Sequence, residues 1–150
     1  GGELSAIAAG LATIEKLEAS KAVQRINGLG SSIMSSLNES LANAGLGSMI
    51  QYSGEAWWPR VAFNDLPIDQ SFALALMRQE FTAQNLLIAS GLNFCLAHDN
   101  KEILQETLDR AGLAFEKMAV AFQSPDPQKF LRGDIAFSDF EVRGHMRAKT

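Results

Sequence analysis

The residue types best suited to chemistry gather in one stretch, GLNFCLAHDNKEI, which spans residues 91 to 103. It contains the single cysteine of the chain, Cys95, and one of its two histidines, His98. A cysteine close to a histidine can act as an activated nucleophile, or the two can supply metal ligands. The alternative is that the stretch is a strand that runs into a helix and carries no chemistry.

Neither reactive interpretation is well supported by spacing. Structural zinc takes four protein ligands and catalytic zinc about three, and the other histidine, His145, lies far away in a polar tail. Residues three apart on a strand point to opposite faces, so a contact between Cys95 and His98 would need a bend between them. We therefore expect no metal site, a buried Cys95 and a structural His98 at a strand-to-helix corner.

Composition narrows the class of protein. A chain of 150 residues with 47% hydrophobic and 20% charged residues is typical of one soluble globular domain. The net charge of -4 argues against nucleic acid and anionic membranes as partners, and no uncharged stretch is apolar enough to predict a membrane span. A single cysteine excludes an internal disulfide and favours a reducing compartment, the cytoplasm.

The sequence contains neither a phosphate-binding loop nor a lysine suited to Schiff-base chemistry. The segment GLGSS, residues 28 to 32, looks like part of a phosphate-binding loop, but it lies within a helical pattern and no Lys-Ser/Thr pair follows it. The lysines fall on polar helix faces or in the tail, without the apolar setting that Schiff-base chemistry requires. The residues alone therefore predict a domain without a reactive centre of its own.

Apolar spacing predicts the elements that hold this stretch. Helices are expected over four segments, about 4–17, 23–41 (ended by Gly45), 68–84 (capped by Asp65 or Asp69) and 100–122 (capped by Asp99 or Asn100). Gly28 and Gly30 weaken the second helix, and close packing against another backbone would explain them.

Strands are expected between these helices, at Ser48 to Ser53, Arg60 to Asn64, Leu86 to Ile88 and Asn93 to Ala97. The connector GEAWWP carries both tryptophans, of which we expect one to pack inward and the other to face a partner. The predicted fold class is α+β, with helices packed on one face of a small, mostly antiparallel sheet.

Four stretches in order carry a resemblance to a known family: GGELSAIAAGLATIEKLE, GEAWWPRVAF, GLNFCLAHDNKEILQETLDRAGLAFEKM and FLRGDIAFSDFEVR. Together they resemble the C-terminal small domain of class III pyridoxal-phosphate-dependent aminotransferases, in the branch similar to glutamate-1-semialdehyde aminomutase. The resemblance implies that residues 1–150 form one such domain, like the small domain of fold-type I enzymes. It also implies a homodimer, and a cofactor lysine in a large domain that would lie upstream. The abrupt helical start supports the expectation that upstream residues are missing.

The resemblance further implies site residues. Ser90 and Asn93 are expected to bind a small amino or keto substrate, and Gly1 and Gly2 to flank the phosphate of pyridoxal phosphate in the partner subunit. No catalytic residue is expected in this chain. From the residues alone, the favoured interpretation of Ser90 and Asn93 is that they are turn residues. The two glycines are equally well explained as a helix lead-in, or partly as a cloning remnant. Ser90 departs from the acidic residue that the aminomutases proper tend to carry there. This departure argues against the aminomutase reaction itself and favours another amino donor or acceptor, although the choice between aminotransferase and aminomutase stays open.

Two hypotheses of function follow. In the first, the chain is part of an aminotransferase or aminomutase and is inactive without its large domain. In the second, it is a non-catalytic interaction module that retains this fold and binds a partner through an exposed face with the tryptophans. Arg60 is either an ion-pair partner for a substrate carboxylate or a solvated surface residue, and surface solvation is the simpler interpretation.

Overall fold

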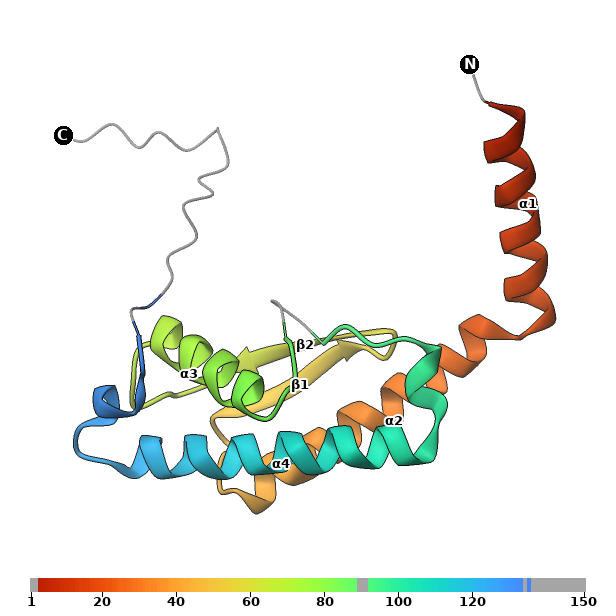
Figure 1. Cartoon of the computed structure of the whole chain (residues 1–150). Coiled ribbons are helices and arrows are strands. Elements are labelled where there is room, and N and C mark those ends of the chain that lie inside the picture. Colours follow the sequence, from red (N-terminus) through yellow and green to blue (C-terminus); the bar gives the residue numbers. More distant parts are fainter. Residues whose placement is uncertain (1–2, 89–91, 134, 136–150) are drawn as a thin grey trace.

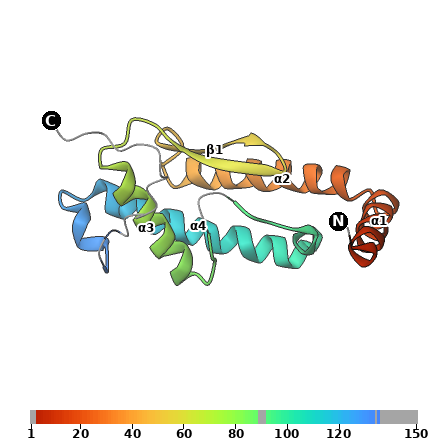
Figure 2. The same cartoon turned by 90° about the horizontal axis from the view of Figure 1, so that it is seen from above.

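The computed structural model describes residues 3–88, 92–133 and 135. Its helices are α1 (Leu4–Ala19), α2 (Ala22–Asn43), α3 (Gln70–Ala83) and α4 (Lys101–Gln123), and two short 3-10 helices are η1 (Leu96–Asp99) and η2 (Pro127–Phe130). Helix α4 packs against both α2 and α3, the hairpin lies over α2, and α1 projects away from the rest (Figures 1 and 2). The α+β class predicted from the sequence is confirmed.

The sheet of the described residues is a single antiparallel hairpin of β1 (Ile50–Glu55) and β2 (Trp58–Phe63). Ile50 pairs with Phe63 at one end, and Glu55 pairs with Trp58 beside the two-residue turn. Ile50 and Tyr52 are buried on the face turned to the helices, where the Tyr52 ring lies 6.5 Å from the Phe115 ring of α4. The opposite face is largely exposed, because side chains alternate along a strand.

Two predicted strands do not form. Leu86 to Ile88 is irregular chain after α3, and Asn93 to Ala97 is irregular up to Cys95 and then enters η1. Asn85 adopts a left-handed conformation with a φ of 60°, so the chain turns sharply at the end of α3. Beside β2, Leu92 donates one hydrogen bond to the Pro59 carbonyl, at 3.3 Å, and no ladder follows. The apolar residues of these runs therefore do not indicate strand pairing. Leu86, Ile88 and Phe94 are partly buried, whereas Leu87 is 94% exposed.

The hairpin is also displaced from its predicted bounds, which changes the position of both tryptophans. Trp57 lies in the turn and Trp58 begins β2, and their side chains stay 53% and 48% exposed. Their ring centroids are 6.0 Å apart, and the Arg60 guanidinium lies 5.2 Å from the Trp58 ring centroid. The prediction that one tryptophan packs inward was wrong, because Pro59 and not Trp58 takes the buried position at this end of β2.

Helix α2 ends as the sequence predicts. Gly45 has a φ of 76°, its N–H donates to the Ala42 carbonyl, and the Leu46 N–H donates to the Leu41 carbonyl. This pair of bonds satisfies carbonyls that the helix end leaves without partners, and Leu41 and Leu46 are both buried at the same point. The left-handed residue that glycine allows thus turns the chain from α2 towards β1.

Side chains of α2 meet the hairpin in two further ways. The Asn38 amide donates to the Tyr52 carbonyl at 2.9 Å and accepts from the Tyr52 N–H at 2.8 Å. A methyl group added to Gly30 would overlap the Ala56 carbonyl oxygen and lie 2.6 Å from Phe94 Cζ. The expectation of close packing is confirmed for Gly30, whereas Gly28 has open space around it.

The side chains of α1 contribute nothing to the core. None of its 16 residues is buried, and the predicted apolar stripe is 45% to 84% exposed at Leu4, Ile7, Leu11, Ile14 and Leu17. Lys21, with a φ of 50°, turns the chain between α1 and α2. None of the helices in the described ranges is long and apolar enough to cross a membrane.

The chain after α4 returns to α3. Gln79 donates from Nε2 to the Phe130 carbonyl at 2.8 Å and accepts from the Arg132 N–H at 2.7 Å. The buried carboxylate of Glu80 lies 3.7 Å from the Arg132 guanidinium. The expectation that the tail crosses another surface is thus met at Phe130 to Arg132, and most of the rest of it lies outside the described residues.

Candidate functional site

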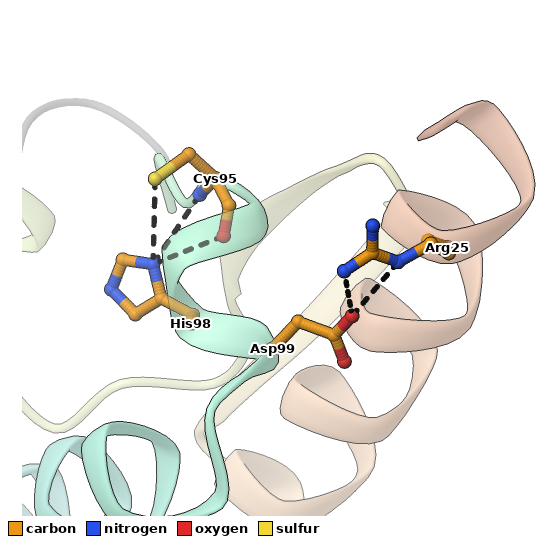
Figure 3. A network of polar contacts seen from close by, with 4 residues as sticks. All are labelled: Arg25, Cys95, His98 and Asp99. Carbon is orange, nitrogen blue, oxygen red and sulfur yellow. Dashed lines mark hydrogen bonds and ion pairs between the residues drawn. The ribbon is translucent and has the colours of Figure 1, made fainter. Parts of the chain in front are cut away.

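The chemistry-bearing stretch folds as a short corner between β2 and α4. Cys95 precedes η1, and its N–H lies 3.3 Å from His98 Nδ1, while the His98 N–H donates to the Cys95 carbonyl at 3.0 Å. Figure 3 shows the imidazole turned back on Cys95. This reciprocal pairing satisfies polar groups at the start of η1, so it gives His98 a structural role.

The bend in η1 also brings the two reactive side chains together. Cys95 Sγ lies 3.9 Å from His98 Nδ1, whereas on the predicted strand they would face apart. The same Nδ1 lies 3.3 Å from both the N and O atoms of Cys95, so it is shared with the backbone and poorly placed to take the thiol proton. The expectation that Cys95 is buried was wrong, because its side chain is exposed at this corner.

Metal binding finds no support in the described ranges. Within residues 3–88, 92–133 and 135, no group of three or more His, Cys, Asp or Glu side chains could hold an ion. One thiol and one imidazole leave a zinc site at least one ligand short. The contact between Cys95 and His98 is therefore better explained as local packing of η1.

An ion pair ties this corner to α2. Arg25 donates from Nε at 3.0 Å and from Nη2 at 2.6 Å to the same oxygen, Oδ2 of Asp99 (Figure 3). Both side chains are about half exposed, so the pair contributes on the order of 1 kcal/mol or less. Asn100 next to it caps α4, accepting from the Glu102 N–H at 2.9 Å and the Ile103 N–H at 3.3 Å. Of the two predicted caps, Asn100 is therefore the one used.

A cleft of about 250 Å³ opens beside this corner. Its walls come from α2, α4, the end of α3, the irregular segment 85–88 and the chain from Leu92 to His98. Most lining side chains are apolar, and the polar ones are Asn85, Asn93, His98 and Thr107. A small pocket that combines apolar walls with a few polar groups is the usual form of a ligand site.

The structure places only some of the residues that the sequence singled out. Asn93 is exposed and lines the cleft with His98. Ser90, Gly1 and Gly2 lie outside the described residues, so their expected roles remain predictions. Sequence reasoning missed Arg25 as the partner of Asp99, because nothing in the local pattern links residues 74 positions apart.

The described residues do not form a complete binding site for pyridoxal phosphate. Among the described residues no lysine lines the cleft, and the described lysines are all exposed: Lys16, Lys21, Lys101, Lys117 and Lys129. A cofactor that reacts through a lysine amine needs that amine inside a pocket. In the described part of the chain no lysine amine is therefore enclosed in this cleft, and a cofactor lysine in an upstream domain remains a prediction.

Comparisons with known proteins add no relative. The chain matches no protein-family model, no curated protein and no solved structure.

Proposed function

We propose that the chain is the C-terminal small-domain part of a pyridoxal-phosphate-dependent class III aminotransferase, similar to glutamate-1-semialdehyde aminomutase. Such an enzyme transfers an amino group to, or within, a small carbonyl substrate. The isolated chain is inactive in this proposal, because the cofactor lysine belongs to a large domain upstream. The complete protein is a homodimer in the cytoplasm, and the free, exposed Cys95 is compatible with that reducing compartment.

The observation that carries the proposal is the uncovered apolar stripe of α1. Five large side chains at helical spacing face solvent along one helix, from Leu4 to Leu17. Burying one such side chain contributes about 1.5–3 kcal/mol, so a stripe of this kind marks a surface that another body covers. In the proposal that body is the large domain, and α1 is the docking element of the small domain.

Other features of the described residues also support a small domain that lacks the cofactor lysine. The chain holds an α+β layer with helices on one face of a hairpin. It presents polar groups such as Asn93 at its surface, and none of the lysines in the described ranges is enclosed. These features suit a domain that shapes a substrate site while another domain holds the cofactor.

The first test is the intact mass of the protein in extract from its native source. A mass several times 16.2 kDa supports the proposal and allows aminotransferase assays on the complete protein. A mass equal to that of the chain would contradict it. In a parallel measurement, the 150-residue chain is titrated with pyridoxal phosphate, and saturable one-to-one binding with turnover of an amino donor would also contradict it.

Replacing Leu11 tests the docking role of α1. In the complete protein, Leu11→Asp places a carboxylate in the proposed interface, so we expect loss of stable assembly and of activity. Thr13→Asp is the matched control, since its side chain lies on another side of the same exposed helix. Equal behaviour of both variants in size-exclusion chromatography and activity assays would argue against docking through the stripe.

Replacing Asn93 tests the substrate role that the resemblance implies. Asn93→Ala in the complete protein is expected to lower kcat/KM by roughly tenfold, the factor that one lost hydrogen bond supplies, while the cofactor remains bound. Steady-state kinetics and cofactor absorbance are measured together. Unchanged kinetics would remove Asn93 from the substrate site.

One observation favours the second hypothesis, a non-catalytic interaction module. Trp57, Trp58 and Arg60 form an exposed group on the hairpin, and Trp and Arg are the residue types that dominate binding energy at protein interfaces. A native mass of 16.2 kDa would favour this function over the enzyme.

A further inference from the structure

We propose that the cleft beside η1 binds a small, uncharged molecule with one aromatic ring and one hydrogen-bonding group. The site lies between α2, α4 and the chain from Leu92 to His98, away from the α1 stripe. The inference stands on the cleft alone and does not depend on the proposed enzymatic function.

Size sets the first limit on the ligand. The cleft has a volume of about 250 Å³, and an apolar cavity of about 150 Å³ lined by leucine, isoleucine and phenylalanine takes up benzene. The same residue types line this cleft, among them Ile33, Leu37, Phe81 and Leu108. A single ring with one or two small substituents therefore matches the volume, whereas a nucleotide or a peptide is too large.

Charge sets the second limit. Among the described residues that line the cleft, none is a lysine, arginine, aspartate or glutamate. Two arginines near the cleft already have partners: Arg25 is paired with Asp99 through two hydrogen bonds, and Arg110 donates to the Gln84 carbonyl and to Glu106. Moving an ionised group into apolar surroundings without a counter-charge is strongly unfavourable. The ligand is therefore uncharged.

The polar side chains determine how the ligand is oriented. Asn85, Asn93 and His98 line the cleft beside its apolar walls. His98 Nδ1 is held by Cys95, and Figure 3 shows the second ring nitrogen, Nε2, on the side of the imidazole away from Cys95. Pairing within η1 thus fixes the imidazole and leaves Nε2 for a hydroxyl group of the ligand.

Three probe molecules of similar size test the roles of the hydroxyl group and of charge in binding to the 150-residue chain. They are p-cresol, which has a ring and a hydroxyl group, toluene, which lacks the hydroxyl group, and benzoate, which is ionised at pH 7. Binding is followed by chemical shifts of backbone amides in ¹⁵N-labelled protein. We expect saturable binding of p-cresol, roughly threefold to tenfold tighter than toluene, since that is the factor for one hydrogen bond. Benzoate is expected to bind most weakly.

Two variants locate the site. Thr107 lines the cleft from α4, so Thr107→Phe fills it and is expected to weaken p-cresol at least tenfold. Glu116→Phe is the matched control, because it adds the same ring to an exposed position of the same helix and leaves the cleft open. His98→Phe retains a ring at the wall but removes Nε2, so it is expected to abolish the preference for p-cresol over toluene. Circular dichroism and the thermal midpoint verify that each variant is folded.

Each outcome decides the proposal. Saturable p-cresol binding that Thr107→Phe removes and Glu116→Phe retains, with amide shifts around Leu37 and Leu108, supports it. Absence of saturable binding to the unmodified chain at millimolar probe concentration would overturn it. So would binding that Thr107→Phe leaves unchanged, or benzoate binding as tight as that of p-cresol.

Discussion

Helices α1 and α2 are neighbours in sequence and share the same apolar spacing, but only α2 buries its apolar side. Each carries large apolar residues three or four positions apart along one side. In α2 this side buries Leu29, Ile33, Leu37 and Leu41 against the hairpin and α4. In α1 no residue is buried, and the element that it mainly contacts is α2.

This difference shows what the spacing of apolar residues can and cannot predict. A spacing of three and four residues identifies a helix and the side on which it seeks burial, but it does not identify the surface that provides that burial. Most helical stability in proteins comes from tertiary packing of an amphipathic face. Helix α2 has that packing within this chain, whereas the apolar face of α1 is exposed.

The largest expected effect comes from truncating one leucine in each helix. Leu41→Ala removes a side chain with 0% exposure and should lower the free energy of unfolding by about 2–5 kcal/mol. Leu11→Ala should stay within about 0.5 kcal/mol of the unmodified chain, since it leaves no cavity. Urea denaturation of the 150-residue chain measures both. A loss above about 2 kcal/mol for Leu11→Ala would show that α1 is packed in solution.

An intermediate effect is expected from the glycines of the same two helices. Gly30→Ala would push a methyl group into the Ala56 carbonyl and Phe94, so we expect a loss of about 1–3 kcal/mol. Gly28→Ala and Gly10→Ala meet open space and should gain up to about 1 kcal/mol of helix stability. Denaturation midpoints and helical circular dichroism distinguish the three. A neutral Gly30→Ala would mean that the hairpin turn does not rest on α2.

The smallest effect is expected at the first turns of α2. Arg25→Ala removes the ion pair with Asp99 and should destabilise the chain by about 1 kcal/mol or less. The difference from the unmodified chain should shrink when salt rises from low to high concentration, because exposed charges are screened. Glu15→Ala in α1, whose side chain is exposed, serves as the control. An effect of Arg25→Ala that salt does not change would point to lost packing and not to charge.

Local rules predicted the helices well and the sheet poorly. Gly45 and Asn100 act as helix ends or caps as expected, because their conformations and hydrogen bonds depend on near neighbours in sequence. The segment around Asn93 was expected to be a strand, but a strand depends on a partner edge, and Leu92 makes only one hydrogen bond to β2. Strand pairing therefore depends on tertiary contacts that a local sequence pattern does not contain.

The candidate site shows the same limit. Sequence reasoning drew attention to Cys95, His98 and Asn93, and the last two line one cleft. It did not predict the cleft itself, because the walls from α2 and α4 come together only through tertiary packing. A glycine inside a helix, Gly30, indicated a close contact in the sequence. The sequence did not indicate that Phe94 makes this contact.

The amide of Asn38 has a consequence for how the protein behaves when concentrated. Its two bonds to Tyr52 occupy an N–H and a C=O on the edge of β1 that faces away from β2. Open strand edges are templates on which chains of different molecules stack into fibrils. One side chain thus replaces a neighbouring strand there, so a molecule that keeps Asn38 in place offers other copies less of an edge on which to grow aggregates.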